Sequence, residues 1–185
     1  YLKISEGCNK NCTYCVIPKI RGSYRSVPME ELLAEARRLA QNGVKELDLV
    51  AQETTVYGGG LYGKKTLPKL LKELCKIDGI EWIRLLYCYP EEITEELIQT
   101  IKEEKKICHY IDMPIQHCDD KILQRMGRRT NQAQLREVIR KFREEIPQKA
   151  KTVVNEEFLP NPVEKHSYSP DEIAEAMKRI GKTMS

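Results

Sequence analysis

The chain has 185 residues, 41% of them hydrophobic, and a formal net charge of +3. This composition predicts one globular domain with a sizeable core, and so small a charge does not by itself indicate a nucleic-acid partner. No apolar run approaches the length of a membrane span, so no membrane partner is expected. An odd number of cysteines, seven, without a secretory leader argues against a disulfide framework and predicts a reducing, cytoplasmic location. Because the chain starts at Tyr1 in a strand-like segment, we expect a piece of a longer protein.

Strand-like and helix-like patterns alternate along the chain. Strands are predicted at residues 2–5, 46–51, 82–86 and 107–111. Helices are predicted at residues 28–41, 66–76, 94–104, 119–126 and 132–145, with Ser26 and Thr94 as N-caps of the first and third. This alternation is typical of the α/β class, in which helices pack outside a parallel sheet and right-handed crossovers join the strands.

Distinctive side chains follow each predicted strand at its C-terminal end. A cysteine-rich loop follows the first strand, and residues 52–55, 87–90 and 112–117 follow or end the other three. The C-terminal ends of parallel strands lie along one edge, where the connecting loops converge. The sequence therefore predicts a functional site at this edge.

Three cysteines of that first loop, Cys8, Cys12 and Cys15, have C-x3-C-x2-C spacing. Thiolates are soft ligands that hold iron-sulfur clusters, and close spacing lets one loop wrap one cluster. Three ligands on a four-iron cube leave one iron open to a small molecule. The triplet therefore predicts a 4Fe-4S cluster used for chemistry rather than for plain electron transfer.

Zinc is the alternative metal for these cysteines. It usually takes four Cys or His ligands, often in paired C-x2-C spacing, and only Cys12 and Cys15 have that spacing here. A fourth ligand would have to come from a distant part of the chain, and the candidates are His109, His117, Cys88 and Cys108.

Positive charge is concentrated late in the chain. We interpret this run as a solvated helix face, which is its usual meaning. Its members are Arg125, Arg128, Arg129, Arg136, Arg140, Lys141 and Arg143.

Three segments carry a resemblance to a known family. They are YLKISEGCNKNCTYCVIPKIRGSYRS at the start, LVAQETTVYG after the second strand and YIDMPIQHCDDKILQRMGRRT after the fourth. They resemble the core of the radical S-adenosylmethionine methylthiotransferases over about residues 1–147, which implies a partial (βα) barrel. The likeness is greatest to the branch that methylthiolates an aspartate of a small-subunit ribosomal protein. The branch that modifies tRNA is the alternative, and only there would nucleic acid be the partner.

The resemblance implies roles for individual residues. The three cysteines would ligate the cluster, and its fourth iron would bind the amino and carboxylate groups of S-adenosylmethionine. Tyr14 would lie near the adenine, Gln52 and Glu53 near the methionine moiety, and Gln116 near the ribose or the substrate. The alternatives are a packed loop aromatic for Tyr14 and a pair of polar residues in a turn for Gln52 and Glu53. No protein side chain is predicted to be catalytic.

The implied chemistry is reductive cleavage of S-adenosylmethionine to a 5'-deoxyadenosyl radical, with electrons from a reductant such as flavodoxin or ferredoxin. In the family a second cluster on an additional N-terminal domain is tied to sulfur insertion, and a small C-terminal β domain helps to dock the substrate. We expect neither in this chain, because its remaining cysteines form no second triplet. Those cysteines are Cys75, Cys88, Cys108 and Cys118.

The segment after Pro147 departs from the family pattern. It lacks the expected Gly-Phe-Pro-Gly turn, and prolines interrupt it at positions 160, 162 and 170. We therefore predict a radical enzyme core at residues 1–147 and a divergent segment with a terminal helix at residues 148–185. A truncated or rearranged C-terminus would leave the cofactor pocket incomplete, so an inactive fragment that retains only the scaffold and metal binding is a further alternative.

Overall fold

The computed structural model describes residues 1–146, which belong to one compact unit. Its main sheet contains three parallel strands in the order β1-β4-β5, with β1 at Leu2–Lys3, β4 at Glu46–Val50 and β5 at Trp82–Leu85. Leu2 pairs with Leu49, and Leu49 pairs in turn with Leu85. The register therefore brings the C-terminal ends of the three strands to one edge, as predicted.

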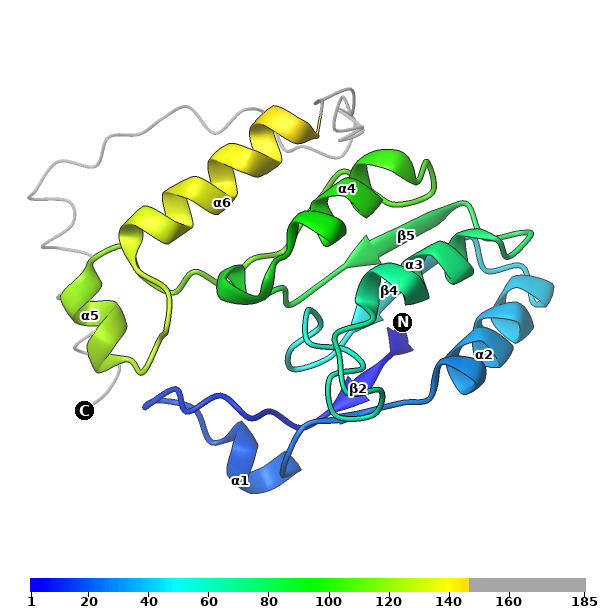
Figure 1. The fold of residues 1–185 in the computed structure, drawn as a ribbon. Coiled ribbons are helices and arrows are strands. Elements are labelled where there is room, and N and C mark those ends of the chain that lie inside the picture. The colour runs from blue at the N-terminus through cyan, green and yellow to red at the C-terminus, as the bar shows by residue number, and fades with distance from the viewer. Residues whose placement is uncertain (147–185) are drawn as a thin grey trace, which may run out of the picture. The chain divides into compact units, whose positions relative to one another are not determined.

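Helices follow the strands and cover one face of this sheet (Figure 1). The three that follow the parallel strands are α2 (Met29–Gln41), α3 (Leu67–Cys75) and α4 (Glu95–Glu103). Two further helices, α5 (Asp120–Arg125) and α6 (Gln132–Glu145), come later in the chain. The bounds of these five helices lie within one residue of the predicted bounds, which confirms the α/β assignment.

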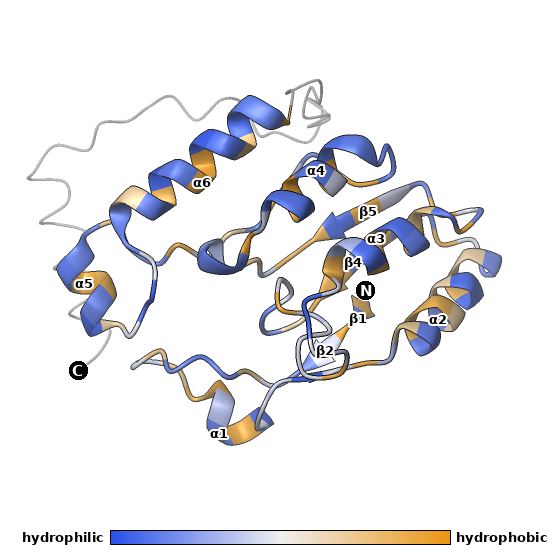
Figure 2. Ribbon diagram, in the orientation of Figure 1, coloured by the Kyte–Doolittle hydropathy of each residue, from blue (hydrophilic) through white to orange (hydrophobic). Residues whose placement is uncertain are grey.

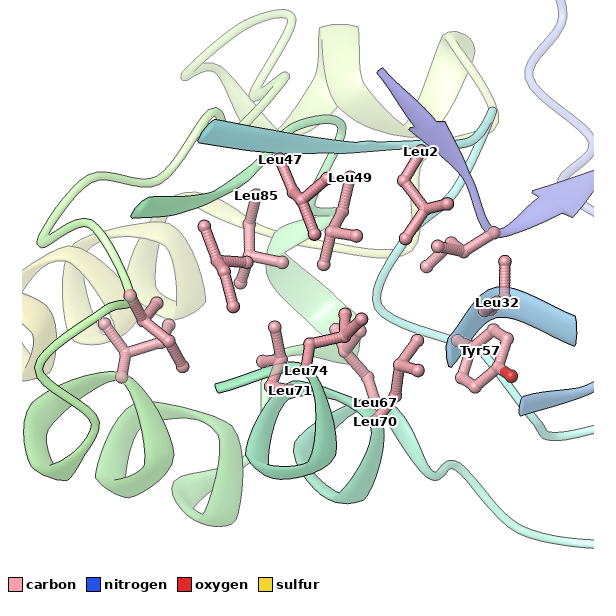
Figure 3. Close-up of a cluster of buried hydrophobic side chains, with 14 of the residues drawn as sticks. Leu2, Leu32, Leu47, Leu49, Tyr57, Leu67, Leu70, Leu71, Leu74 and Leu85 are labelled. Atoms are coloured by element: carbon pink, nitrogen blue, oxygen red, sulfur yellow. The ribbon is translucent and has the colours of Figure 1, made fainter. Parts of the chain in front are cut away.

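Leucines fill the space between the helices and the sheet. Leu47 and Leu49 of β4 alternate with the less buried Glu46, Asp48 and Val50, so the strand turns one face to the helices. Figure 3 shows the strand leucines opposite the leucines of α3 and Leu32 of α2. The leucines of α3 recur with helical period and are fully buried; they are Leu67, Leu70, Leu71 and Leu74.

The predicted fourth strand is wrong as a full strand. Only Ile107 forms a bridge, to Ile83 of β5. Its backbone runs beside β5 through two hydrogen bonds, Ile83 N–H to Lys106 O and Cys108 N–H to Ile83 O. Beyond that point His109 and Tyr110 are exposed, so the segment lacks the buried alternation that would hold it in register. The described part of the chain contains an open sheet, not a closed barrel.

The first predicted strand is divided in two at Ile4. β1 ends at Lys3, and β2 (Ser5–Glu6) pairs antiparallel with β3 (Arg25–Ser26). Ile4 joins both sheets, because its N–H donates to Val50 O and its carbonyl accepts from Val27 N–H.

One of the two N-cap predictions is wrong. Thr94 caps α4 by accepting from Leu97 N–H, as predicted. Ser26 caps nothing, because α2 begins after Pro28 and the Ser26 hydroxyl accepts from Gly58 N–H instead.

Within residues 1–146, no helix is both long enough and apolar enough to cross a membrane. The predicted division at residue 147 and the terminal helix lie outside the described residues and stay predictions.

The fold leads to a stability prediction. Leu71→Ala should lower the free energy of unfolding by about 2–5 kcal/mol, because Leu71 is fully buried between α3 and the sheet. Leu61→Ala is the control, since Leu61 is 46% exposed and should cost far less. Urea unfolding followed by circular dichroism measures both. Equal losses in the two variants would show that the α3 leucines do not form the core.

Candidate metal and cofactor site

The cysteine loop leaves β2 at a glycine that no other residue could replace without strain. Gly7 has φ +80°, and a Cβ atom there would lie 2.3 Å from the carbonyl oxygen of Ser23. The next residue, Cys8, donates its N–H to Gly22 O at 3.1 Å. Gly22 directly follows α1 (Ile17–Arg21), a short helix that the sequence analysis missed. The start of the loop is therefore held against the end of α1.

The three cysteines lie on this one loop as free thiols. Cys8 and Cys12 are buried and Cys15 is half-buried. Cys15 N–H donates to Cys12 O at 3.0 Å, so these two belong to a single turn. Among residues 1–146, no three His, Cys, Asp or Glu side chains are already arranged to hold a metal ion. The loop thus supplies a set of sulfur donors of the type that iron-sulfur clusters take.

Two of these thiols face a cavity at the sheet edge. It has a volume of about 460 Å³, and its lining includes Cys8, Cys15, Gln52, Tyr87 and Tyr89. Gln52 lies two residues after the end of β4, and its side-chain carbonyl oxygen is buried with no hydrogen-bond partner among the described residues. A buried acceptor of this kind normally has a partner, so it is available to a donor group of a ligand in the cavity. The structure therefore brings Gln52 together with the cysteines, as predicted.

Glu53 points to a different place. It lines a second cavity of about 280 Å³, together with Cys8 and Lys10, and is only 1% exposed. Burial raises the pKa of its carboxyl group to about 7, although a hydrogen bond from Thr55 and the nearby Lys10 ammonium oppose the shift. Glu53 is thus close to Cys8 but is not part of the lining of the larger cavity.

Lys10 anchors the loop to the sheet edge, a role that the sequence analysis missed. Its ammonium nitrogen lies 2.5 Å from a carboxylate oxygen of Glu92, 3.4 Å from Glu91 and 3.6 Å from Glu53. Glu91 and Glu92 belong to a short 3-10 helix, η1 (Pro90–Glu92), that follows β5. The only signal in the sequence was a lysine between two cysteines, which does not identify its partners.

The segment after α5 holds the loop from the other side. Thr13 donates its N–H to Met126 O and its hydroxyl to Arg125 O, both at 3.0 Å. The dark blue trace in Figure 1 shows the loop running from β2 toward α5 before it returns to α1. Gly127 has φ +70°, and a Cβ atom there would lie 2.5 Å from the carbonyl oxygen of Asn11. This close backbone contact requires glycine.

The interpretation of the late basic residues as a solvated face is wrong for Arg128. Arg136, Arg140 and Arg143 are exposed on α6, whose ribbon is hydrophilic along most of its length (Figure 2). Arg128 is only 7% exposed, and its guanidinium lies over the ring of Tyr89 at 4.2 Å from the ring centroid. Charge patterning cannot distinguish these arginines, because burial depends on how the α5 segment docks on the cysteine loop.

Tyr14 and Gln116 line neither cavity. Tyr14 is 51% exposed, and burial of its hydroxyl, with Cys12 nearby, raises the pKa of Tyr14. Gln116 is exposed, and its φ of +68° lies in the left-handed region. Their roles toward a cofactor stay predictions. The fourth strand-end segment still contributes to the site, because Asp112 accepts from Tyr87 N–H at 2.9 Å.

A family model described as the Radical SAM superfamily matches residues 2–160, so this chain belongs to that superfamily. Among curated proteins, it is 68% identical over 147 residues to "Ribosomal protein uS12 methylthiotransferase RimO" of Lachnoclostridium phytofermentans and 57% identical over 148 residues to the protein of the same name from Clostridium tetani. Each match covers 80% of this chain and 33% of the relative. The chain thus spans about a third of the length of these relatives.

Solved structures show the same fold at much lower identity. TsrM from Kitasatospora setae, a radical S-adenosylmethionine methyltransferase determined with cobalamin and a 4Fe-4S cluster bound, superposes with a TM-score of 0.61 at 18% identity. The match covers 78% of this chain and 28% of TsrM. A second TsrM structure, with tryptophan and an S-adenosylmethionine analogue bound, gives a TM-score of 0.60.

The burial of Glu53 leads to a pH prediction. The carboxyl group of unfolded Glu53 has its ordinary pKa of 4.5, whereas the folded protein holds the proton until about pH 7. The folded state therefore binds more protons between these two values, so its stability falls as pH rises through this window. Glu53→Gln should make the metal-free chain more stable than wild type by about 1–3 kcal/mol above pH 7, with little gain below pH 4.5.

Urea unfolding at a series of pH values measures this difference. Glu103→Gln is the control, because Glu103 is an exposed residue in the last turn of α4. A Glu53→Gln effect that does not change with pH would contradict the raised pKa.

Proposed function

We propose that this chain is the radical-generating core of a methylthiotransferase that modifies ribosomal protein uS12. The observation that carries the proposal is the cavity at the sheet edge, whose lining brings Cys8 and Cys15 of the triplet together with Gln52. Membership of the radical SAM superfamily and the 68% identity to a RimO enzyme support it.

In this proposal Cys8, Cys12 and Cys15 hold one 4Fe-4S cluster, and S-adenosylmethionine occupies the cavity beside it. The residues fit this use: the donors are three free thiols on one loop, and Gln52, which lines the cavity of about 460 Å³, has a buried side-chain oxygen without a partner among the described residues. When bound, the reduced cluster supplies an electron to the sulfonium, with flavodoxin or ferredoxin as its source. The chain itself binds and orients the cofactor.

Individual residues then have distinct parts. The Gln52 side-chain carbonyl would accept a hydrogen bond from the amino group of S-adenosylmethionine, whose N–H groups remain donors when its nitrogen binds iron. Tyr87 and Tyr89 supply ring surfaces in the same cavity. Glu53 lines the second cavity beside Cys8, so it would contact the cluster side rather than S-adenosylmethionine. Tyr14 and Gln116 line neither cavity, so they would contact the cofactor only at its exposed edge.

The substrate follows from the relatives rather than from the cavity. Two curated relatives that are 57% and 68% identical carry the same name, which specifies ribosomal protein uS12. The tRNA-modifying branch is the alternative, because it shares the radical step and differs in the molecule that receives the methylthio group. A ribosomal substrate would place the reaction in the cytoplasm.

The cluster assignment predicts iron content. After anaerobic reconstitution the chain should bind about four irons, and Cys8→Ala, Cys12→Ala or Cys15→Ala should each remove most of them, since a methyl group cannot replace a thiolate ligand. Cys118→Ala is the matched control, because Cys118 is an exposed cysteine outside the triplet. Iron analysis and visible absorption measure the result. Full iron in all three triplet variants would reject the assignment, and one bound zinc without iron would favour the zinc alternative.

The substrate assignment predicts the behaviour of a chimera. Residues 1–147 of this chain should replace the matching part of the Clostridium tetani relative, which is 57% identical. The chimera should methylthiolate uS12 under reducing conditions, because the radical core and the rest of the enzyme then come from the same family. Mass spectrometry of uS12 and of tRNA measures the product. The same chimera with Cys12→Ala is the negative control. A methylthio group on tRNA, or on neither molecule, would contradict the proposed substrate.

A further inference from the structure

Arg128 is a buried cation outside the cavity and outside the predicted ligand set. It follows Gly127, and its backbone N–H donates to Leu123 O at 2.9 Å, which fixes it to the end of α5. The close contact between Gly127 and Asn11 brings this part of the backbone against the cysteine loop. The side chain of Arg128 is thereby held at the back of the loop rather than in solvent.

Its guanidinium group has three neighbours in the described residues. One terminal nitrogen donates to Pro114 O at 2.8 Å, and the group lies over Tyr89 at 4.2 Å from the ring centroid. The other terminal nitrogen lies 4.0 Å from the sulfur of Cys12, in hydrogen-bonding orientation. The planar fork thus approaches Cys12 while its remaining contacts are to a carbonyl and an aromatic ring, neither of which carries a net charge.

Lys10, the other largely buried cation near the loop, differs from Arg128 in its charged neighbours. Three carboxylates lie within 3.6 Å of its ammonium group, so its charge is balanced locally. Glu91, the carboxylate whose charge acts on Arg128, is itself occupied by Thr130 and Lys10. Arg128 shares Glu91 with Lys10, but unlike Lys10 it directs a side-chain nitrogen at a sulfur of the triplet.

A fixed positive charge and a hydrogen bond at a ligand sulfur stabilise the more negative, reduced form of an iron-sulfur cluster. We propose that Arg128 is a positioning residue that donates a hydrogen bond to the Cys12 sulfur and raises the reduction potential of the cluster held by the triplet. This inference rests on the proposed function, since it requires the cluster. Arg128, which follows α5, would thus control how readily the cluster is reduced.

The test is a redox titration of the reconstituted 185-residue chain, followed by electron paramagnetic resonance. Arg128→Met should shift the reduction equilibrium at least tenfold toward the oxidised cluster, which is about 59 mV for a one-electron couple. Arg128→Lys should give a smaller shift, because the charge is kept and the planar fork is lost. Arg136→Met is the matched control, since Arg136 is an exposed arginine on α6, and it should leave the potential unchanged.

A second measurement detects Arg128 in the wild-type protein, without a substitution. Wild-type chain grown with nitrogen-15-labelled arginine should show a weak nitrogen-15 coupling to the reduced cluster in pulsed electron paramagnetic resonance. The coupling should disappear in labelled Arg128→Lys, which identifies its source. This readout decides the question even if Arg128→Met fails to fold or to hold iron.

The outcomes separate the inference from the proposed function. A wild-type chain that binds no cluster would overturn both. A wild-type cluster that shows no arginine coupling, or an Arg128→Met cluster with full iron and the wild-type potential, would overturn the role of Arg128 alone. A shift of the same size in Arg136→Met would also overturn it, because general surface charge would then explain the effect.

Discussion

The buried ammonium group of Lys10 is the interaction on which the position of the cysteine loop depends. Its side chain is 11% exposed, and it joins a loop at the start of the chain to carboxylates that follow β4 and β5. A buried charge is costly unless it is paired, and breaking such a pair by removing one partner costs about 3–5 kcal/mol. The cost applies to the close pair of Lys10 with Glu92 at 2.5 Å, so this pair holds the cysteine loop to the segment after β5.

The three carboxylates around Lys10 do not share its charge equally. Burial opposes ionisation of Glu92, but hydrogen bonds from Lys10 and Lys65 outweigh it and lower the pKa of Glu92. Burial dominates at Glu53 and raises its pKa to about 7. The pKa of Glu91 is lowered as well, so Glu91 and Glu92 are the ionised partners of Lys10, while Glu53 can be neutral beside Cys8. This difference lets the protein place three acidic side chains near one cation without collecting a large negative charge beside the thiols.

On the side of the cysteine loop away from Lys10, the segment at the end of α5 holds the loop in place, although no fourth strand forms there. Between β5 and residue 146, the chain pairs with the sheet only at Ile107, yet it reaches the site through Asp112 and then through Arg128. Gly127 lets its backbone lie against that of Asn11. Thr13 then joins the two segments by donating hydrogen bonds to the carbonyl oxygens of Arg125 and Met126. A site at the edge of an open sheet can therefore be ordered by a docked helix end where continuous strand pairing has stopped.

Local patterns in the sequence are enough to predict the helices and the set of sulfur donors. Helix bounds such as those of α6, the Thr94 cap and the Cys8, Cys12 and Cys15 spacing depend on residues a few positions apart, so periodicity and spacing are sufficient to predict them. Parallel strand order also placed Gln52 near the triplet.

The side chains that meet the cysteines from distant parts of the chain could not be predicted from local patterns, and the folded structure was needed to identify them. Lys10 pairs with Glu92 across 82 positions, and Arg128 reaches Cys12 across 116. It also decided that Gln116 lines neither cavity, and that Ile107 makes a single bridge in place of a strand. The physical reason is that such contacts depend on how separate elements dock. A charge or a glycine has no local pattern that reveals its partner, whereas a helix or a ligand triplet repeats its own geometry within a few residues.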